Sequence, residues 1–269
     1  MLVRNLPKTR QPTSGLILNR ATPLGQTITH FMPLNGDPRE VISGTKLTYG
    51  VGGVTGLDDR GKSLRGDGVT ACASIALDLS GYTKLSISFW LWWDLFSAST
   101  SLALEYTPNS NNVNGFVIAP SSGSSRFYVH TRGAAGAENG GEFSFPSSAA
   151  WHHYLVTFDR TTGATLGVKA YVDGIQQTLG VVSTADIADN FDNSTLYLFS
   201  RGNASLFGAG RMQNLVLRGG YIAGSAEAVA EYQTPWALFA PQSSNIAGVG
   251  APIVAAGPAR LRTLMGAGV

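Results

Sequence analysis

The feature that most constrains the fold of this chain is the alternation of side chains over residues 151–159. Tyr154, Val156 and Phe158 would share one face of an extended segment, because side chains repeat with a period of two along a β-strand. The run is rich in aromatic and β-branched residues, which favours a strand over a helix. A strand with one apolar face needs partners that cover this face, so the sequence predicts a sheet here.

A second alternating run covers residues 168–172 and ends in Asp173-Gly174. Asp-Gly pairs favour the tight hairpin turn in which both central residues have positive φ. The chain is therefore expected to fold back on itself through antiparallel strands, and this pair of runs is the best-determined part of the prediction.

The composition extends this prediction to the whole chain. Of the 269 residues, 13% are charged and 33 are glycines, while aromatic residues reach 10% and supply a core. Few charges and many small turn residues are typical of short strands joined by tight turns. We expect an all-β sandwich with strands at 85–93, 101–106, 115–119, 126–131, 194–200 and 210–218. One short C-terminal helix is expected at 224–232, with Ser225 as its N-cap.

Charge is distributed unevenly along the chain. All 17 acidic residues and 13 of the 19 basic residues lie between residues 37 and 239, which leaves this body with a formal charge of −4. Residues 1–36 and 240–269 carry basic but no acidic residues, and the start is rich in proline and the end in Ala and Gly. We therefore expect extended arms at 1–45 and 240–269 around a sandwich at 46–239. The candidate partner-binding residues of these arms are Arg4, Lys8, Arg10, Arg20, Arg260 and Arg262.

Several classes of protein are disfavoured. Cys72 is the only cysteine, so there is no disulfide framework. The start of the chain has no apolar segment of the secretory type, and no run approaches the roughly 18 apolar residues that cross a bilayer. We therefore expect synthesis in a cytoplasm without a signal peptide, and no membrane partner. Six basic residues are too sparse in the arms to favour nucleic acid.

Catalysis and cofactor binding have no support in the sequence. Glycanases of sandwich fold need two nearby carboxylates, and no Glu-x-Asp-x-x-Glu string is present. We expect a non-enzymatic protein with no catalytic residue and no cofactor-binding residue. The only candidates for a metal are Asp186, Asp189 and Asp192, which could hold Ca²⁺ at a loop, although a solvated turn is the favoured interpretation.

Two groups of residues are candidates for glycan contact. Asn109, Asn111, Asn112 and Asn114 form a polar loop that could bind a sugar, but an Asn-rich turn without a ligand is favoured. The second group, Trp90, Trp92 and Trp151, could form a stacking platform, but their apolar surroundings favour core positions.

Four landmarks give the chain a family resemblance: Gly66-Asp67-Gly68, the aromatic run 86–92, the Trp-His-His run at 151–159, and Ala170–Gly174. In this order they resemble the laminin-G-like, or concanavalin A-like, jelly-roll family over about residues 62–222. The resemblance implies a jelly-roll β-sandwich of antiparallel strands. In this family the His of the Trp-His motif has no catalytic duty, which implies a structural role for His152 and His153.

The end of the domain resembles a narrower group. Ser225-Ala226-Glu227 followed by Pro235–Phe239 is similar to the close of laminin-G-like proteins encoded in tailed-bacteriophage and prophage genomes. This resemblance implies a non-enzymatic virion protein, either a capsid decoration or cement subunit or a head or tail fibre component. Its expected partners are major capsid or tail subunits and further copies of itself, and its location is the virion. The alternative is a carbohydrate-binding, lectin-like adhesin for host-surface glycans.

Overall fold

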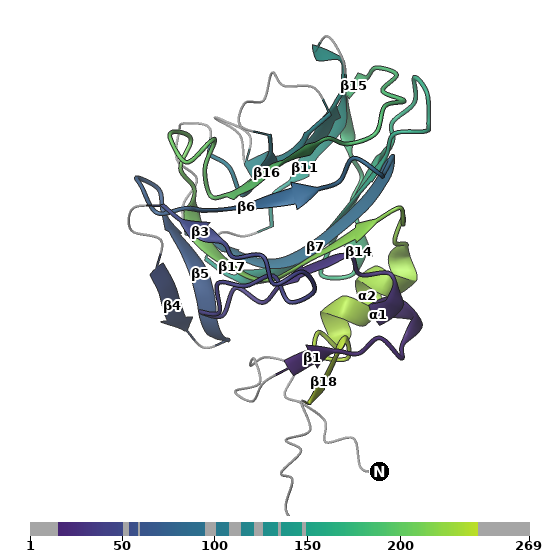
Figure 1. The fold of residues 1–269 in the computed structure, drawn as a ribbon. Helices are drawn as coiled ribbons and strands as arrows, with labels where there is room; N and C mark the ends of the chain where they lie inside the picture. Colours follow the sequence, from purple (N-terminus) through teal and green to yellow (C-terminus); the bar gives the residue numbers. More distant parts are fainter. Residues whose placement is uncertain are drawn as a thin grey trace, which may run out of the picture.

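Two antiparallel sheets face each other in the computed structural model, which describes residues 16–50, 54–58, 60–94, 101–107, 114–120, 126–133, 136–146 and 149–241. Figure 1 shows one sheet above the other, with helices α1 (Pro23–Gln26) and α2 (Ser225–Gln233) below the lower sheet. We call the lower sheet the helix-side sheet and the upper one the opposite sheet. The expected all-β sandwich with one short C-terminal helix is confirmed.

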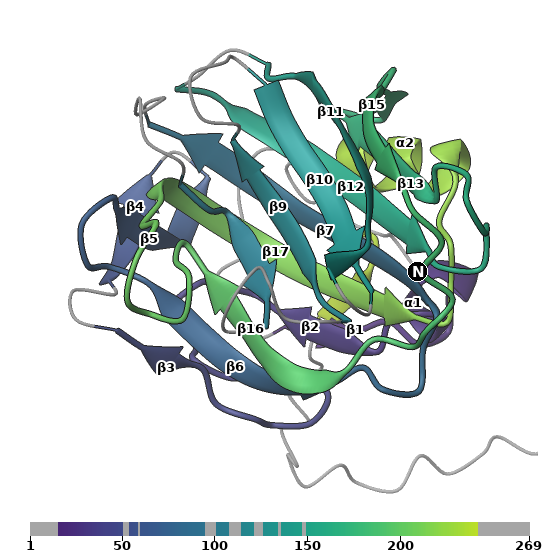
Figure 2. The same ribbon diagram turned by 90° about the horizontal axis from the view of Figure 1, so that it is seen from above.

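The opposite sheet has eight strands, which overlie the other sheet in the view of Figure 2. Their spatial order is β15 (Gly180–Thr184), β11 (Glu138–Ser144), β10 (Arg126–Arg132), β9 (Phe116–Pro120), β8 (Leu104–Tyr106), β16 (Asn193–Leu198), β6 (Ala73–Asp78) and β3 (Thr48–Tyr49).

The helix-side sheet is built around the most apolar strand of the chain. Its order is β14 (Ile175–Gln176), β13 (Val168–Val172), β12 (Trp151–Asp159), β7 (Lys84–Trp93), β17 (Ala209–Gly219), β5 (Gly61–Asp67) and β4 (Val54–Asp58), and β2 (His30–Met32) also pairs with β17.

The hydrophobic core fills the space between the two sheets. Alternate residues of β7, among them Ile87, Phe89 and Leu91, point into it together with Tyr154 and Phe158 of β12. All five are at most 1% exposed, and each such side chain contributes on the order of 1.5–3 kcal/mol through burial. The inward faces therefore hold the fold, and the outward faces are left for function.

The hairpin predicted at Asp173-Gly174 is confirmed. Val172 pairs with Ile175, and the two turn residues have φ of 51° and 82°. Asp173 also accepts hydrogen bonds from the His153 backbone N–H and from a ring nitrogen of His152, 2.8 and 2.7 Å away. The turn residue thus ties the hairpin to the start of β12.

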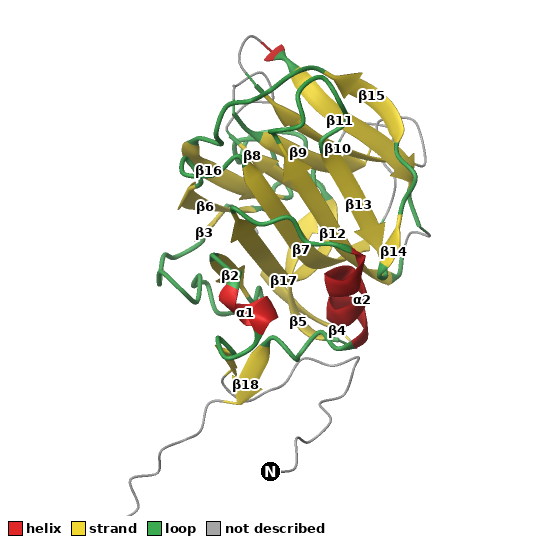
Figure 3. Cartoon of the chain, turned by 90° about the vertical axis from the view of Figure 1, so that its right-hand side faces the viewer, coloured by secondary structure: helices red, strands yellow, loops and turns green. Residues whose placement is uncertain are grey.

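Residues 16–45 differ from the expected extended arm. Strand β1 (Leu16–Leu18) pairs with β18 (Phe239–Pro241), and β2 pairs with β17. Ile28 and Phe31 are buried with Trp236, Leu238 and Phe239 in a second apolar cluster outside the sandwich core. Figure 3 shows α1, β2 and β18 on the same side of the molecule as α2. Within the described residues, this segment is an integral part of the domain.

Strand β17 contains an irregularity that divides its outer face. Pairing with β7 shifts between Gln213 and Val216, and Asn214 has a φ of 51°. An extra residue of this kind bends a strand and re-aims its side chains. The half of β17 after the bulge faces α2 and residues 16–34 and 236–241. The half before the bulge lies on a part of the outer face that α2 and these described segments leave uncovered.

Candidate functional site

Helix α2 closes one half of the outer face of the helix-side sheet. It begins at Ser225, but its N-cap is Gly224 rather than the expected Ser225, and the Glu227 carboxylate accepts a hydrogen bond from the Gly224 backbone N–H at 2.8 Å. The helix presents Ala228 and Glu231 to the sheet. A carboxylate therefore lies on the face where an apolar side chain would be expected.

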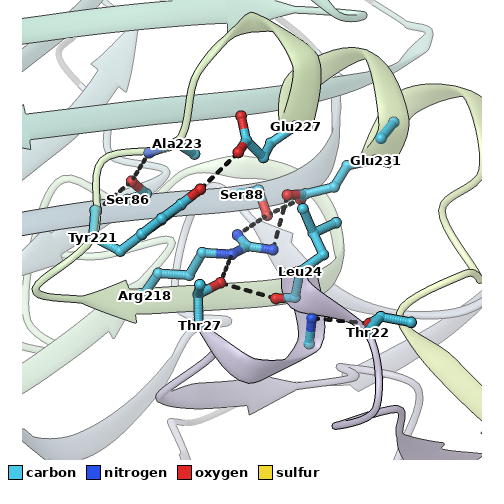
Figure 4. Close-up of polar contacts among 12 residues, drawn as sticks. Thr22, Leu24, Thr27, Ser86, Ser88, Arg218, Tyr221, Ala223, Glu227 and Glu231 are labelled. Carbon is cyan, nitrogen blue, oxygen red and sulfur yellow. Dashed lines mark hydrogen bonds and ion pairs between the residues drawn. The ribbon is translucent and has the colours of Figure 1, made fainter.

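An ion pair beneath the helix explains why Glu231 faces the sheet. Its Oε1 lies 2.8 Å from Nη2 of Arg218 on β17, and the arginine side chain is fully buried (Figure 4). Ser88 of β7 donates to the other carboxylate oxygen, and His153 lies 3.7 Å away. Burial opposes ionisation, but the Arg218 guanidinium, His153 and Ser88 together hold the pKa of Glu231 below its ordinary value. The helix is thus docked by a buried charge pair.

The same network fastens the N-terminal segment. Arg218 Nε donates to the hydroxyl of Thr27, just after α1, at 3.1 Å (Figure 4). Ser86 of β7 links the backbone of Tyr221 and Ala223 ahead of α2. All these polar groups serve to hold segments together. This half of the face is therefore a structural interface.

A small cavity of about 10 Å³ lies at the edge of this interface. It is lined by Trp90, His153, Asn214 and Glu231 among others. The amide atoms of Asn214 and Nδ1 of His153 are buried there without a hydrogen-bond partner in the described structure. This volume is close to that needed for one water molecule, so the cavity is far too small for a sugar.

The uncovered half of the same face carries two half-buried tryptophans. Trp92 and Trp151 are cross-strand neighbours on β7 and β12, with ring centroids 6.2 Å apart and an edge-on geometry. The Arg211 guanidinium of β17 lies 5.1 Å from the Trp92 ring centroid. The interpretation of these tryptophans as core residues is wrong: they alternate with the inward residues, such as Leu91 and Trp93, and so point outward.

Trp90 joins this outer surface to α2. Its ring stacks on Tyr232 of the helix, with centroids 5.9 Å apart, and Arg60 lies 3.7 Å above the same ring. Arg60 also donates to the Gln213 side chain at 3.3 Å and lies 5.7 Å from the Trp151 ring. Trp90 is only 6% exposed, so it offers little surface of its own.

The outer face of the opposite sheet carries an ionic cluster. Glu105 of β8 is fully buried, and its two carboxylate oxygens lie 3.0 and 3.2 Å from Nε of Arg201. Burial raises the pKa of Glu105 to about 7, and the opposing effect of Arg201 is the smaller one. This carboxyl group is therefore half protonated near neutral pH.

The second part of the cluster lies on β10 and β11. His130 is 3% exposed, and its Nε2 accepts a hydrogen bond from Arg132 Nε at 3.3 Å. Burial, with the nearby Arg132 and Arg201 charges, lowers the pKa of His130 to about 3. Arg132 also pairs with Glu138 at 3.0 Å. The histidine is thus neutral across the physiological range.

Each of the three glutamates on the described strands of this face is engaged by an arginine: Glu105 by Arg201, Glu138 by Arg132 and Glu142 by Arg126. A retaining glycosidase needs one carboxylate free to attack and a second one to donate a proton. The pairing seen here leaves none of the three glutamates free. The arrangement stabilises a charged surface rather than a reacting pair.

The candidate asparagine loop is only partly described. Asn109, Asn111 and Asn112 lie outside the described residues. The side-chain oxygen of Asn114 accepts a hydrogen bond from Arg160 at 3.0 Å. Arg160 is 1% exposed and also donates to the backbone carbonyls of Asn190 and Arg132. Asn114 therefore helps to satisfy a buried guanidinium, whose pKa burial lowers to about 10.

The other predicted site residues are not brought together. Asp186, Asp189 and Asp192 are all exposed, and the described residues contain no group of three or more His, Cys, Asp or Glu side chains that could hold a metal ion. Arg20 donates to the backbone carbonyl of Ile28 at 2.9 Å, within its own segment. The remaining arm residues, Arg4, Lys8, Arg10, Arg260 and Arg262, lie outside the described residues. No described helix has the length and hydropathy of a membrane span.

The fold and these surfaces define a jelly-roll β-sandwich. Helix α2 covers one half of the outer face of the helix-side sheet, Trp92 and Trp151 lie on the other half, and the outer face of the opposite sheet is polar. Residues 65–217 match the family model Laminin_G_3, described as the concanavalin A-like lectin/glucanases superfamily. This match spans more than half of the chain, so the chain belongs to that superfamily. No curated protein sequence matches the chain.

Solved structures with the same fold include a domain of an arabinanase, the binding domain of a toxin and a sialidase. Domain 4 of AbnA, an extracellular arabinanase of Geobacillus stearothermophilus in complex with arabinotriose, is 16% identical with a TM-score of 0.58, over 77% of this chain and 98% of that one. The binding domain of Paraclostridial Mosquitocidal Protein 1 is 14% identical with a TM-score of 0.60, over 80% of this chain and 53% of that one. Trypanosoma rangeli sialidase is 14% identical with a TM-score of 0.56, over 78% of this chain and 33% of its own.

Proposed function

We propose that this chain is a non-catalytic binding module whose ligand is a glycan, held against Trp92 and Trp151. Neighbours of the same fold support a binding role, since one is bound to arabinotriose and others are the binding domains of toxins. At 10–16% identity these neighbours share the fold alone, so the argument for this chain depends on its own surface.

The observation that carries the proposal is the pair of half-buried tryptophans on the uncovered outer face. A sugar ring presents C–H groups on its faces and hydroxyl groups around its rim. It therefore packs on an aromatic ring while its hydroxyls bond to polar neighbours, and tryptophan offers the largest such surface. The Arg211 guanidinium lies beside Trp92. The strands beneath fix both rings at adjacent positions, which favours binding without rearrangement.

The test is a glycan array with the full chain, followed by calorimetry on the bound glycans. We expect Trp92→Ala to weaken binding by about tenfold, the value of one aromatic stacking contact. The matched control is Tyr197→Ala, because Tyr197 is also half-buried and lies on the opposite sheet, paired with Glu105. A silent array, or a Trp92→Ala protein that binds as tightly as the parent, would overturn the proposal.

A second candidate function is that of a virion component, a decoration, cement or fibre subunit located on a particle. Its support is the distribution of charge, since Arg4, Lys8, Arg10, Arg260 and Arg262 lie in terminal stretches without any acid. These residues would contact neighbouring subunits, and two linked contacts bind far more tightly than one. The two functions are compatible in one protein.

This second candidate is tested by truncation. Residues 28–34 are packed into the domain, so the informative deletions are 1–15 and 242–269 rather than the whole of 1–45. Loss of incorporation into particles with an unchanged melting temperature would support the candidate. Normal incorporation of both truncated proteins would exclude a role for the terminal stretches.

A further inference from the structure

Trp92 and Trp151 meet at a steep angle on the uncovered outer face. They are cross-strand neighbours on β7 and β12, their ring centroids lie 6.2 Å apart, and their ring planes are inclined by 67°. Side chains at such positions of a sheet contact each other directly, but these two rings do not continue one another as a flat surface. We call the pair the tryptophan corner, because the two rings stand at an angle to each other.

Each ring of the tryptophan corner has an arginine on one side. The Arg211 guanidinium lies 5.1 Å from the Trp92 ring centroid, and that of Arg60 lies 5.7 Å from the Trp151 ring centroid. A guanidinium at such a distance packs over the face of the indole. The Nε1 atom of Trp151 is buried, so the exposed part of this ring consists of carbon atoms. At most one face of each tryptophan is then left for a ligand.

The angle and the spacing exclude two consecutive sugar rings, one on each tryptophan. A sugar ring in contact with an indole lies about 4 Å above its plane. With planes inclined by 67° and centroids 6.2 Å apart, two sugars over converging faces would approach each other to about 2 Å, well inside van der Waals contact. Two sugars over diverging faces would lie about 11 Å apart, farther than consecutive rings of a glycan chain. The tryptophan corner therefore offers room for one sugar ring at a time.

We infer that the tryptophan corner holds a single sugar ring at the end of a glycan chain, which rests on the proposed glycan-binding function and adds the part of the glycan that is bound. The sugar would lie with its face on one indole and its hydroxyl-bearing rim against the other, where hydroxyl oxygens meet the positive edge of the aromatic ring. A terminal ring has one glycosidic link and leaves its other side free for the second indole. A ring within a chain has links on both sides, so the chain end is the part that fits.

The experiment measures how affinity depends on the length of the glycan. The full chain is applied to an array that carries each common hexose and pentose as a monosaccharide and as linear chains of two to six residues. We expect affinity to change by less than about threefold along a bound series, because longer chains add no second aromatic contact, which would be worth up to about tenfold. A larger rise would overturn the inference and leave the proposed function intact. A silent array would overturn both.

Two substitutions test whether one sugar ring touches both tryptophans. Trp92→Ala and Trp151→Ala should each weaken binding of the shortest glycan bound on the array by severalfold, and the melting temperature shows whether each variant is folded. Two separate sites would give a different result, because the shortest glycan would occupy the stronger site and only one substitution would weaken its binding. That result would overturn the inference. The control Tyr197→Ala, on the opposite sheet, should leave binding unchanged. If neither tryptophan substitution changes binding, both proposals are wrong.

Discussion

Two buried glutamates on the two outer faces behave in opposite ways. Glu231 under α2 and Glu105 on the opposite sheet are 3% and 0% exposed, yet the pKa of Glu231 is lowered while that of Glu105 is raised to about 7. Glu231 is surrounded by Arg218, Ser88 and His153. Among the described residues Glu105 forms an ion pair with the partly exposed Arg201, and Arg132 acts on it more weakly. The number and burial of the donors, rather than the burial of the acid, decides which form is stable.

This difference gives the two faces different uses. The charge pair under α2 is permanent across the physiological range, as suits a structural joint. The cluster on the opposite sheet changes its protonation near neutral pH, so its charge depends on conditions. Four predictions test this comparison, beginning with the largest expected effect.

The substitution Arg218→Met should destabilise the domain by about 3–5 kcal/mol, because it leaves the buried Glu231 charge without its cation. The loss should be larger at pH 8 than at pH 5, because without the Arg218 guanidinium the burial of Glu231 raises its pKa and favours the protonated carboxyl at the lower pH. Urea unfolding measures both values. The double variant Arg218→Met/Glu231→Leu should recover most of the loss. A loss below about 1 kcal/mol would show that the pair does not hold the helix.

For Glu105, the folded-state pKa of about 7 lies above its ordinary value of 4.5. The folded chain then binds a proton that the unfolded chain lacks, so the free energy of unfolding falls as pH rises from 4.5 through 7. The fall amounts to at most about 3 kcal/mol. Glu105→Gln should remove this fall when urea unfolding is compared at pH 5 and pH 8. An unchanged pH dependence in the variant would contradict the raised pKa.

His130 should change the free energy of unfolding with pH in the direction opposite to Glu105. Its folded-state pKa of about 3 lies below the ordinary value of 6.5, so the unfolded chain binds the extra proton. The free energy of unfolding therefore falls as pH decreases from 6.5 toward 3, by about 2 kcal/mol between pH 6.5 and 5. In the parent this effect offsets that of Glu105 over the same range. His130→Asn should reveal the Glu105 effect alone, and a curve that stays flat would count against it.

The smallest effect is expected for Arg201→Gln. At pH 5 Glu105 is protonated in the folded chain, so the loss of its partner should cost little. At pH 8 the carboxylate is ionised and the cost should rise by about 1 kcal/mol, a typical net value for one intramolecular hydrogen bond. The control Arg126→Gln removes a partner that is 52% exposed and should change neither value. An equal cost of Arg201→Gln at both pH values would mean that Glu105 does not titrate.

The regular parts of the fold could be predicted from the sequence because their periodicity is local. Strands β7, β12 and β13 follow the alternation, and the Asp173-Gly174 hairpin follows from its turn chemistry. Strand β11 was not predicted, because its glycines leave no alternation to detect. At Gly140 an added Cβ would lie 2.3 Å from His130, so the close approach of β10 requires this glycine.

The candidate site was harder to predict because it depends on which face of each strand points outward and on pairing between segments that are distant in the sequence. The sequence places Trp90 and Trp92 on the face opposite Leu91, but it does not show which face is inward. Trp151, Trp92 and Arg211 become neighbours only through the register of three strands. The role of Glu231 also depends on Arg218, whose partners lie on other elements.

The short ladder between β1 and β18 has a mechanical consequence. Leu16 pairs with Pro241, and the pairing then runs inward to Leu18 and Phe239. The two ends of the described chain therefore leave the domain at one point, as Figure 1 also shows. A force that separates them opens the ladder one pair at a time instead of shearing it. The domain can thus be inserted into a loop of a carrier protein through two neighbouring attachment points. A force along the carrier would then act on the β1–β18 ladder before it acts on the sandwich.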